Sequence, residues 1–498
     1  MQFIESFKKL GTDAATYGLS TAIGRMISLI MAPILTRIFA PSDYGVIALV
    51  QLAVGLVVVC AGMNLGSGIT YYYFKNEDEK ERAKLLTSGY AVVLALSFLI
   101  AFAMYALAPQ IEQLLHSGSG EDSKHLDLVL YLKISAVGLF FGLAMSIAQT
   151  ILRILGKAKK YFLVELTSLL VNLVCVLVLV VWLRVGIEGV FYAGVISSIA
   201  GLLIGILFVY DRFASSLSIL IVLPILTYSL PQMPGVLVNW LQSQTGRFFI
   251  NYYSTLTEQG LYSIALTIAS LLVLVTTAFR LAYDPYAVSI MKSPDAKNIY
   301  AKTFSVYALI FGCFLGFVVA FAKPMLVVLT PSEYHAAHKM VFLLAAAGFL
   351  MGLNNILATG IWLSRRTVFT SYAQIITLVV VVIANRILVP DYFAFGAAFS
   401  FLLGSFAQSL AYYWFAQRLI NIPYKFWRVM IFVAVTICVG WFHSFYVDSM
   451  SFFTSVLFGL CTFILMCIIS LYIITTRDER KFAFKYLRNR YSKHYHEL

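Results

Sequence analysis

The sequence has little charge. Only 12% of its 498 residues are Asp, Glu, Lys or Arg, whereas soluble domains carry about 25%. Hydrophobic residues make up 61% of the chain and the mean hydropathy is +0.87. So few charged side chains cannot cover a water-soluble fold of this length, which excludes a soluble enzyme. The composition predicts an all-α integral membrane protein whose helices are covered by lipid.

Cysteine pairs and nucleotide-binding motifs are also absent. The six cysteines stand inside apolar runs and form no CxxC pair, which excludes a disulfide framework and a zinc site. No GxxxxGK[ST] loop is present, so ATP hydrolysis is not expected. His335 and His338 form an HxxH beside Glu333, but no further ligand accompanies them. We expect no metal, no cofactor and no cleavable signal peptide.

Long apolar runs fill most of the chain. A helix crosses about 30 Å of hydrocarbon with roughly 20 apolar residues. On this measure the sequence predicts about fourteen transmembrane helices. The predicted spans are 12–38, 42–66, 85–108, 127–153, 161–183, 187–210, 217–246, 258–283, 300–322, 339–363, 368–388, 393–417, 426–446 and 451–475.

The positive charges indicate an orientation. With both termini placed in the cytoplasm, about three quarters of the 36 lysines and arginines fall in inner segments. One span more or fewer would invert every later loop and remove this bias. Residues 477–498 form a basic, aromatic tail that we expect to lie against anionic lipid. The membrane therefore explains the net charge of +13, and no nucleic-acid partner is expected.

Two stretches of the chain resemble each other. Residues 16–49 and 227–266 each begin with Thr-Tyr-x-Leu, continue into a proline-containing span, and reach a glycine that opens the next span. Two six-helix copies would run in the same direction, related by a pseudo-twofold axis along the membrane normal. We expect an N-lobe at 1–212, a C-lobe at 213–420, two further helices at 421–476, and the tail.

Particular segments point to a family. APILTRIFAPSDYGVIALVQ and GMNLGSGITYYYF resemble the start of bacterial polysaccharide-repeat-unit flippases of the Wzx type. These flippases belong to the multidrug/oligosaccharidyl-lipid/polysaccharide exporter superfamily. TYSLPQMPGVLVNWLQSQTGRFFINYYSTLTEQGLYSIA is similar to the matching region of their second half. Many relatives have an aspartate near Gly246-Arg247, where this chain is basic, so no proton or cation role is carried over to that position.

The resemblance implies a fold and a substrate. It implies two six-helix lobes around a central cavity that opens alternately to each side of the bacterial inner membrane. The implied substrate is an undecaprenyl-diphosphate-linked oligosaccharide of O-antigen and lipopolysaccharide synthesis, moved from the cytoplasmic to the outer leaflet. The implied partners are membrane lipid and a polymerase and chain-length regulator of the same pathway.

Arg25 is the first candidate for substrate binding. It lies near the middle of the first span, where an ionised side chain costs about 2.5–3.5 kcal/mol. In one reading it lines a cavity and attracts a diphosphate or acidic sugar, because its forked donors match two oxygens at once. In the other reading it pairs with a carbonyl or with a carboxylate such as Glu165 inside the bundle.

Three further cations are weaker candidates. Arg247 and Lys133 lie nearer the outer ends of their spans, where ligand contact and snorkelling to the interface explain them equally well. Arg280 lies at the inner end of its span. It serves either a cytoplasmic gate or the general preference for positive charge on the inner side.

Amides and one carboxylate complete the set of polar candidates. Gln149 and Asn239 are proposed to bond sugar hydroxyls, although amides inside membranes also join helices to one another. Glu165 is the one clear carboxylate inside a predicted span. It is a candidate for proton coupling, with a salt bridge as the alternative.

Prolines mark the candidate hinges. Pro33 lies in the first span, and Pro231 and Pro234 lie in the seventh, which corresponds to it in the repeat. Proline removes a backbone hydrogen bond and bends a helix. We expect these two spans to bend as the protein alternates between its two openings, although simple kinks without function are the alternative.

Three functions remain open at this point. The first is a flippase that passes the glycan and diphosphate through a hydrated, cationic central cavity and makes or breaks no covalent bond. The second is a cation-coupled multidrug antiporter of the same superfamily, which calls for a deep carboxylate where the first span offers Arg25. The third is a membrane glycan polymerase or ligase, which calls for long outer loops with catalytic residues.

Overall fold

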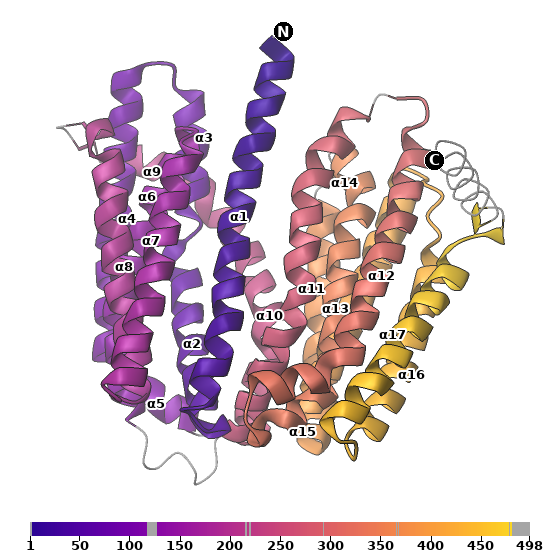
Figure 1. The fold of residues 1–498 in the computed structure, drawn as a ribbon. Coiled ribbons are helices and arrows are strands. Elements are labelled where there is room, and N and C mark those ends of the chain that lie inside the picture. The colour runs from indigo at the N-terminus through magenta and orange to yellow at the C-terminus, as the bar shows by residue number, and fades with distance from the viewer. Residues whose placement is uncertain are drawn as a thin grey trace, which may run out of the picture. The chain divides into compact units, whose positions relative to one another are not determined.

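The structure is a computed structural model that describes residues 2–116, 127–214, 217, 218, 221–291, 293–364, 366, 368–477, 479 and 480. All regular elements of these residues are helical (Figure 1). They are α1 (Gln2–Thr36), α2 (Pro41–Gly62), α3 (Leu65–Lys75), α4 (Glu79–Ala106), α5 (Ala108–His116), α6 (Leu128–Ile154), α7 (Ala158–Val176), α8 (Ile187–Val209), α9 (Val222–Ser229), α10 (Met233–Tyr253), α11 (Leu256–Ser289), α12 (Ala296–Leu329), α13 (His338–Leu357), α14 (Thr359–Leu363), α15 (Val368–Leu419), α16 (Phe426–Val447) and α17 (Phe452–Ile474).

The predicted all-α membrane fold is confirmed. Eleven segments of the described chain are long and apolar enough to cross a membrane. One of them, α15, contains two predicted spans that meet at Phe393, where φ is 48° and ψ is −131°. The predicted spans that these segments leave out overlap α1 and the α9–α10 pair. The tail from residue 481 onward lies outside the described residues.

The chain forms two compact units. Unit 1 comprises residues 1–267, 329–337 and 374–404, and unit 2 comprises residues 268–328, 338–373 and 405–498. The predicted lobe boundaries and the axis relating the two copies stay predictions.

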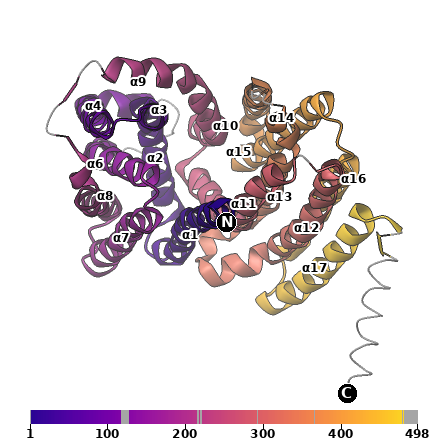
Figure 2. The ribbon, with the colours of Figure 1, turned by 90° about the horizontal axis from the view of Figure 1, so that it is seen from above.

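In unit 1, α6 packs against α2, α4 and α8, and α7 packs against α8 and α1 (Figure 2). Where α2 meets the first turn of α11, a Cβ atom at Gly45 would lie 1.9 Å from the carbonyl oxygen of Leu256. Gly260 makes the reciprocal approach, because a Cβ atom there would lie 1.9 Å from the carbonyl oxygen of Pro41. The two helices can touch only because both positions lack a side chain.

In unit 2, several polar side chains of the core are hydrogen-bonded within the unit. The hydroxyl of Tyr307 donates to the carbonyl of Phe349 at 3.2 Å. Asn354 donates to Gln408 at 3.1 Å and accepts a hydrogen bond from Ser409 at 2.7 Å. Because bilayer hydrocarbon offers no water, such internal pairing is what allows these groups to be buried.

Candidate functional site

The predicted second span is broken. α2 ends at Gly62 and α3 begins at Leu65, and Met63 and Asn64 between them have φ values of 41° and 52°. The left-handed region costs a non-glycine residue about 1–2 kcal/mol. Two consecutive residues in this conformation interrupt the helical hydrogen bonds in the middle of a membrane segment. Strained backbone of this kind gathers at functional sites.

The predicted seventh span is also broken, as its prolines suggested. A 3₁₀ turn, Leu230–Gln232, separates α9 from α10 and contains Pro231, while Pro234 is the second residue of α10. Each proline removes a backbone donor, so the helix changes direction at this point. Pro33 lies inside α1, which continues past it to Thr36. Whether these prolines act as hinges stays a prediction.

A hydrogen bond joins the two breaks. The side-chain amide nitrogen of Asn64 donates to Oε1 of Gln232 at 3.1 Å, and Nε2 of Gln232 donates to the carbonyl of Tyr228 at 3.1 Å. The residues of the bridge are 168 positions apart in the chain. The interruption of one membrane helix is therefore tied to the interruption of another.

Beyond the bridge, α3 and α9 lie against each other. The rings of Tyr71 and Tyr228 stack with their centroids 4.4 Å apart and their planes 11° apart. A Cβ atom at Gly68 would lie 2.4 Å from the hydroxyl oxygen of Ser229 and 2.8 Å from the carbonyl oxygen of Ile225. The α3–α9 pair thus depends on a glycine and on an aromatic stack.

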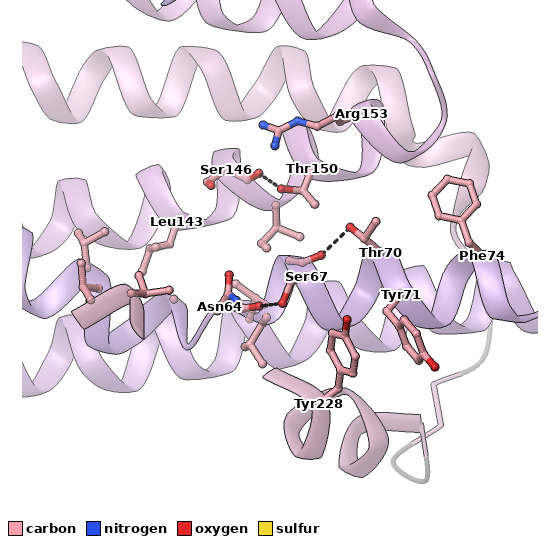
Figure 3. A pocket seen from close by; sticks show the side chains of 18 of the residues that line it. Asn64, Ser67, Thr70, Tyr71, Phe74, Leu143, Ser146, Thr150, Arg153 and Tyr228 are labelled. Atoms are coloured by element: carbon pink, nitrogen blue, oxygen red, sulfur yellow. Dashed lines mark hydrogen bonds between the residues drawn. The ribbon is translucent and has the colours of Figure 1, made fainter. Parts of the chain in front are cut away.

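A cavity of about 940 Å³ lies beside this pair. One wall carries Asn64, Ser67 and Thr70, and α6 supplies the facing side chains (Figure 3). The polar and aromatic residues around it are Asn64, Ser67, Thr70, Tyr71, Phe74, Lys75, Ser146, Thr150, Arg153 and Tyr228. Its described lining includes two cationic side chains and no Asp or Glu.

A second cavity of about 640 Å³ continues along the same helices. Its polar lining residues are Gln51, Ser135, Ser146, Asn172, Ser198 and Trp240, and it shares Val58, Val59, Leu143 and Ser146 with the first cavity. We call the two cavities together the polar groove. From Ser135 to Arg153 along α6, at 1.5 Å per residue, the groove extends about 27 Å. This is close to the hydrocarbon thickness of about 30 Å.

Small residues leave the space open. A Cβ atom added at Gly62 or at Gly194 would meet nothing within 4 Å. At Gly66 it would lie 3.4 Å from the methyl group of Thr150, so α3 and α6 approach closely at this level. A branched side chain at these positions would occupy the groove.

The two cations lie towards the end of the groove that Thr150 also lines. Arg153 is exposed and its guanidinium lies 5.3 Å from the ring centroid of Tyr161. Lys75 is also exposed, with Nζ 5.6 Å from the ring centroid of Tyr72. An arginine keeps its charge over an aromatic face, and its forked donors match the geometry of an oxyanion.

None of the predicted substrate-binding cations lines either cavity. Arg25 is half-buried in α1. The ammonium of Lys133 lies 5.3 Å from the ring centroid of Tyr105. Arg280 is exposed and lies 4.0 Å from Asp284 one turn further along α11.

Arg247 lies on α10. Its Nη1 donates to Gln244 at 3.4 Å, while Nε is buried without a hydrogen-bond partner in the described chain. Asn239 is exposed on the same helix and lines neither cavity. Substrate contacts by all these residues stay predictions.

The structure brings two of the predicted residues together. Nε2 of Gln149 donates to Oε2 of Glu165 at 2.6 Å and so joins α6 to α7. Gln149 is buried and Glu165 is half-buried, and neither lines the polar groove. The contact agrees with the helix-joining reading of intramembrane amides.

The groove residues were missed by the sequence reasoning. The sequence draws most notice to isolated charges inside spans, whereas Arg153 and Lys75 fall among the many lysines and arginines of the predicted inner segments. The signal that would have found them is a spacing of hydroxyl side chains. Ser67 and Thr70 are three residues apart and Ser146 and Thr150 four apart, so each pair lies on one face of a helix.

Comparisons with known proteins bear on the fold and the family. The family model described as "Polysaccharide biosynthesis protein" matches residues 34–339. The chain is similar in structure to the lipid II flippase MurJ in an inward closed conformation, with a TM-score of 0.71 and 13% identity over 91% of this chain and 98% of that one.

Two further structures share the fold. An inward-facing multidrug resistance MATE family transporter of the MOP superfamily matches with a TM-score of 0.61 and 16% identity, covering 80% of this chain and 97% of that one. An outward-facing structure of the same kind matches with 0.58 and 17% identity, over 84% and 97%. No curated protein matched. The predicted resemblance is confirmed by the family model, and these structures show the same fold.

Proposed function

This chain belongs to the polysaccharide biosynthesis protein family, and we propose that it is a flippase for undecaprenyl-diphosphate-linked oligosaccharide repeat units. It moves them from the cytoplasmic to the outer leaflet of the bacterial inner membrane by alternating access, with both of its termini in the cytoplasm. The proposed pathway is synthesis of the O-antigen of lipopolysaccharide, and the proposed partners are the polymerase and the chain-length regulator of that pathway.

The observation that carries this proposal is the polar groove. A glycan presents many hydroxyls, and moving each into hydrocarbon without a partner costs several kcal/mol. The groove, about 27 Å long, provides hydrogen-bonding partners towards both of its ends, from Ser135 to Arg153, with a more apolar stretch where the two cavities meet. The polyprenyl chain needs no such partners and stays in lipid.

The cationic end of the groove suits the diphosphate. Arg153 and Lys75 present donors and positive charge, and no Asp or Glu occurs among the described lining residues. Charge-assisted hydrogen bonds to phosphate are about twice as strong as neutral ones. We keep Arg25, Arg247, Lys133 and Arg280 as proposed further contacts along the substrate's path, with Gln149 and Asn239 as amide contacts and Glu165 as the proposed coupling group.

The structural similarity to MurJ supports this function, because MurJ is a lipid II flippase. Similarity to the MATE transporters supports the antiporter as the alternative. The groove favours the flippase, since exchange of drugs for Na⁺ or H⁺ would be served by a carboxylate in the lining.

The test is translocation by the purified protein in liposomes. A fluorescent polyprenyl-diphosphate oligosaccharide is supplied, and its exposure to an impermeant glycosidase is followed over time. Arg153→Gln should slow translocation by about 10- to 100-fold, the equivalent of one lost charge-assisted hydrogen bond. Arg386→Gln is the matched control, because Arg386 is also exposed over a tyrosine ring, Tyr253 at 5.5 Å, and lines neither cavity.

Two results would contradict the proposal. In the first, wild-type protein leaves the glycan on its original side but exchanges a cationic drug for Na⁺ or H⁺. That result would indicate an antiporter. The other is an equal loss in both arginine variants, which removes the groove from the route.

A further inference from the structure

We infer that the wall of the polar groove is a hydrogen-bond-accepting surface that binds an uncharged sugar and discriminates against an acidic one. The inference rests on the proposed function and adds to it the chemical class of the sugar next to the diphosphate.

The evidence lies in where the hydroxyl protons of the lining point. Ser67 donates to the carbonyl of Asn64 at 2.8 Å, and Thr70 donates to that of Gly66 at 2.7 Å. On the facing helix, Thr150 donates to the carbonyl of Ser146 at 3.0 Å (Figure 3).

The second cavity repeats the pattern. Its lining residue Ser198 donates to the carbonyl of Gly194 at 2.8 Å. The four hydroxyls therefore bond to carbonyls three or four residues earlier in their own helices.

This arrangement fixes the polarity of the wall. A hydroxyl has one proton to donate and two lone pairs that accept. With the proton held by the helix, the oxygen is left to accept hydrogen bonds from a ligand. The wall built by Ser67, Thr70 and Thr150 is therefore rich in acceptors.

An acceptor-rich wall suits some ligands and repels others. A neutral sugar hydroxyl donates to such an oxygen and still accepts from water or from another group. A carboxylate offers acceptors alone, so beside Ser67, Thr70 and Thr150 it loses water without gaining a donor from these three hydroxyls. A hexose or an N-acetylhexosamine therefore fits, and a hexuronic acid does not.

Donors and acceptors occupy different positions along the groove. Arg153 follows Thr150 by three residues, about 4.5 Å along α6. A diphosphate at Arg153 and Lys75 would thus place the first sugar in the cavity beside Thr150, Ser67 and Thr70. The stacked pair of Tyr71 and Tyr228 also lines this cavity and offers an aromatic surface for the apolar face of the ring.

The experiment measures sugar discrimination by purified protein in nanodiscs. The probes are polyprenyl diphosphate carrying one neutral hexose, the same lipid carrying one hexuronic acid, and the lipid without sugar. The variants are Thr150→Val and Thr70→Val, which keep the shape and remove the acceptor, and Ser67→Ala. Thr303→Val is the matched control, because Thr303 is a half-buried residue of α12 that donates to the carbonyl of Ile299 at 2.8 Å and lines neither cavity.

Wild-type protein should bind the neutral-hexose lipid at least about tenfold more tightly than the hexuronic-acid lipid. Each groove variant should weaken neutral-hexose binding about fivefold, leave binding of the sugar-free lipid unchanged, and so reduce the preference. Thr303→Val should keep the wild-type preference. Thermal unfolding of each variant checks that it is folded.

Separate outcomes overturn the inference and the proposed function. If wild-type protein binds the sugar lipids but Thr150→Val and Thr70→Val keep the full preference, the accepting wall is wrong and the flippase stands. If Na⁺ alone stabilises the wild type and not these variants, the oxygens hold a cation and the inference is wrong. If wild-type protein binds none of the three lipids, the proposed function fails.

Discussion

The core of unit 2 and the groove of unit 1 hold polar groups in different ways. In the core of unit 2, Tyr307 bonds to Phe349 and Asn354 bonds to Gln408, each on a neighbouring helix. In unit 1 the hydroxyls of the groove bond to their own helices and leave their oxygens facing a cavity. The first arrangement stabilises a packed core, and the second provides a polar surface for a ligand.

Particular glycines of the unit 2 core and of the groove differ in a similar way. A Cβ atom at Gly352 of unit 2 would lie 2.0 Å from the hydroxyl oxygen of Tyr307, so the space that this glycine leaves is filled by a side chain. At Gly62 and Gly194 of unit 1 the space is left open. We therefore expect substitutions in unit 2 to change stability and substitutions in the groove to change transport.

The largest expected effect is on the packing of unit 2. Phe349 is fully buried and its ring contacts those of Tyr307 and Phe432. Phe349→Ala should lower the free energy of unfolding by about 3–5 kcal/mol because it leaves a cavity. Thermal unfolding in detergent measures this, with Phe442→Ala as control, since Phe442 is 63% exposed. Transport per folded molecule should persist, and its loss would break the contrast between the units.

A substitution in the groove should lower transport and leave stability unchanged. Gly62→Leu places a side chain in open space, so we expect unchanged thermal stability and a transport rate lowered by about tenfold, close to the effect of 1.4 kcal/mol. Gly62→Ala adds one carbon and should keep most of the transport. Liposome translocation and thermal unfolding are measured on the same preparations. A leucine variant that transports normally would show that the groove is not on the substrate's route.

A smaller effect is expected at the bridge between the broken helices. Asn64→Ala, Gln232→Ala and the double variant form a cycle across the 3.1 Å hydrogen bond. Its coupling in translocation should be about 0.5–1.5 kcal/mol, because the bond holds the two breaks in one arrangement. Additive effects of the two single substitutions would mean that the breaks act independently.

The smallest effect concerns the turn after α16. Lys339 bonds the carboxylate of Asp448 at 2.7 Å and lowers the pKa of Asp448 below its usual value. The ionised carboxylate therefore stabilises the folded protein at pH values above the pKa that Asp448 has in the unfolded chain. This stabilisation is lost as the pH falls through the lowered pKa of the folded state. Because the pair is half-exposed, we expect a few tenths of a kcal/mol. Wild type should unfold at a slightly higher temperature than Asp448→Asn at pH 6, and the difference should be smaller at pH 3.

The sequence predicted the membrane helices because apolar runs of fixed length have few alternatives in lipid. It also predicted the interruption near Pro231, since proline imposes a local change on any helix. The interruption at Met63 and Asn64 was not predicted. Methionine gives no signal for a positive φ, and asparagine favours it only modestly, so tertiary contacts such as the bond to Gln232 decide this conformation.

The groove was not predicted, for a related reason. Arg153 and Lys75 obey the inner-loop charge bias, and that explanation hid their position beside a cavity. Ser67, Thr70 and Thr150 are ordinary residues of membrane helices, and only the packing of α3 on α6 makes them face one another. Local patterns fix each helix face, whereas the partner of that face depends on the fold.

The stretch where the two cavities meet has a consequence for the speed of transport. It is lined by Val58, Val59, Leu143 and Ser146, so it offers a passing glycan one hydroxyl among three hydrocarbon side chains. On the proposed route, a sugar there gives up more water than at either side and so meets a free-energy barrier. Longer or more polar headgroups would meet a higher barrier and cross this stretch more slowly.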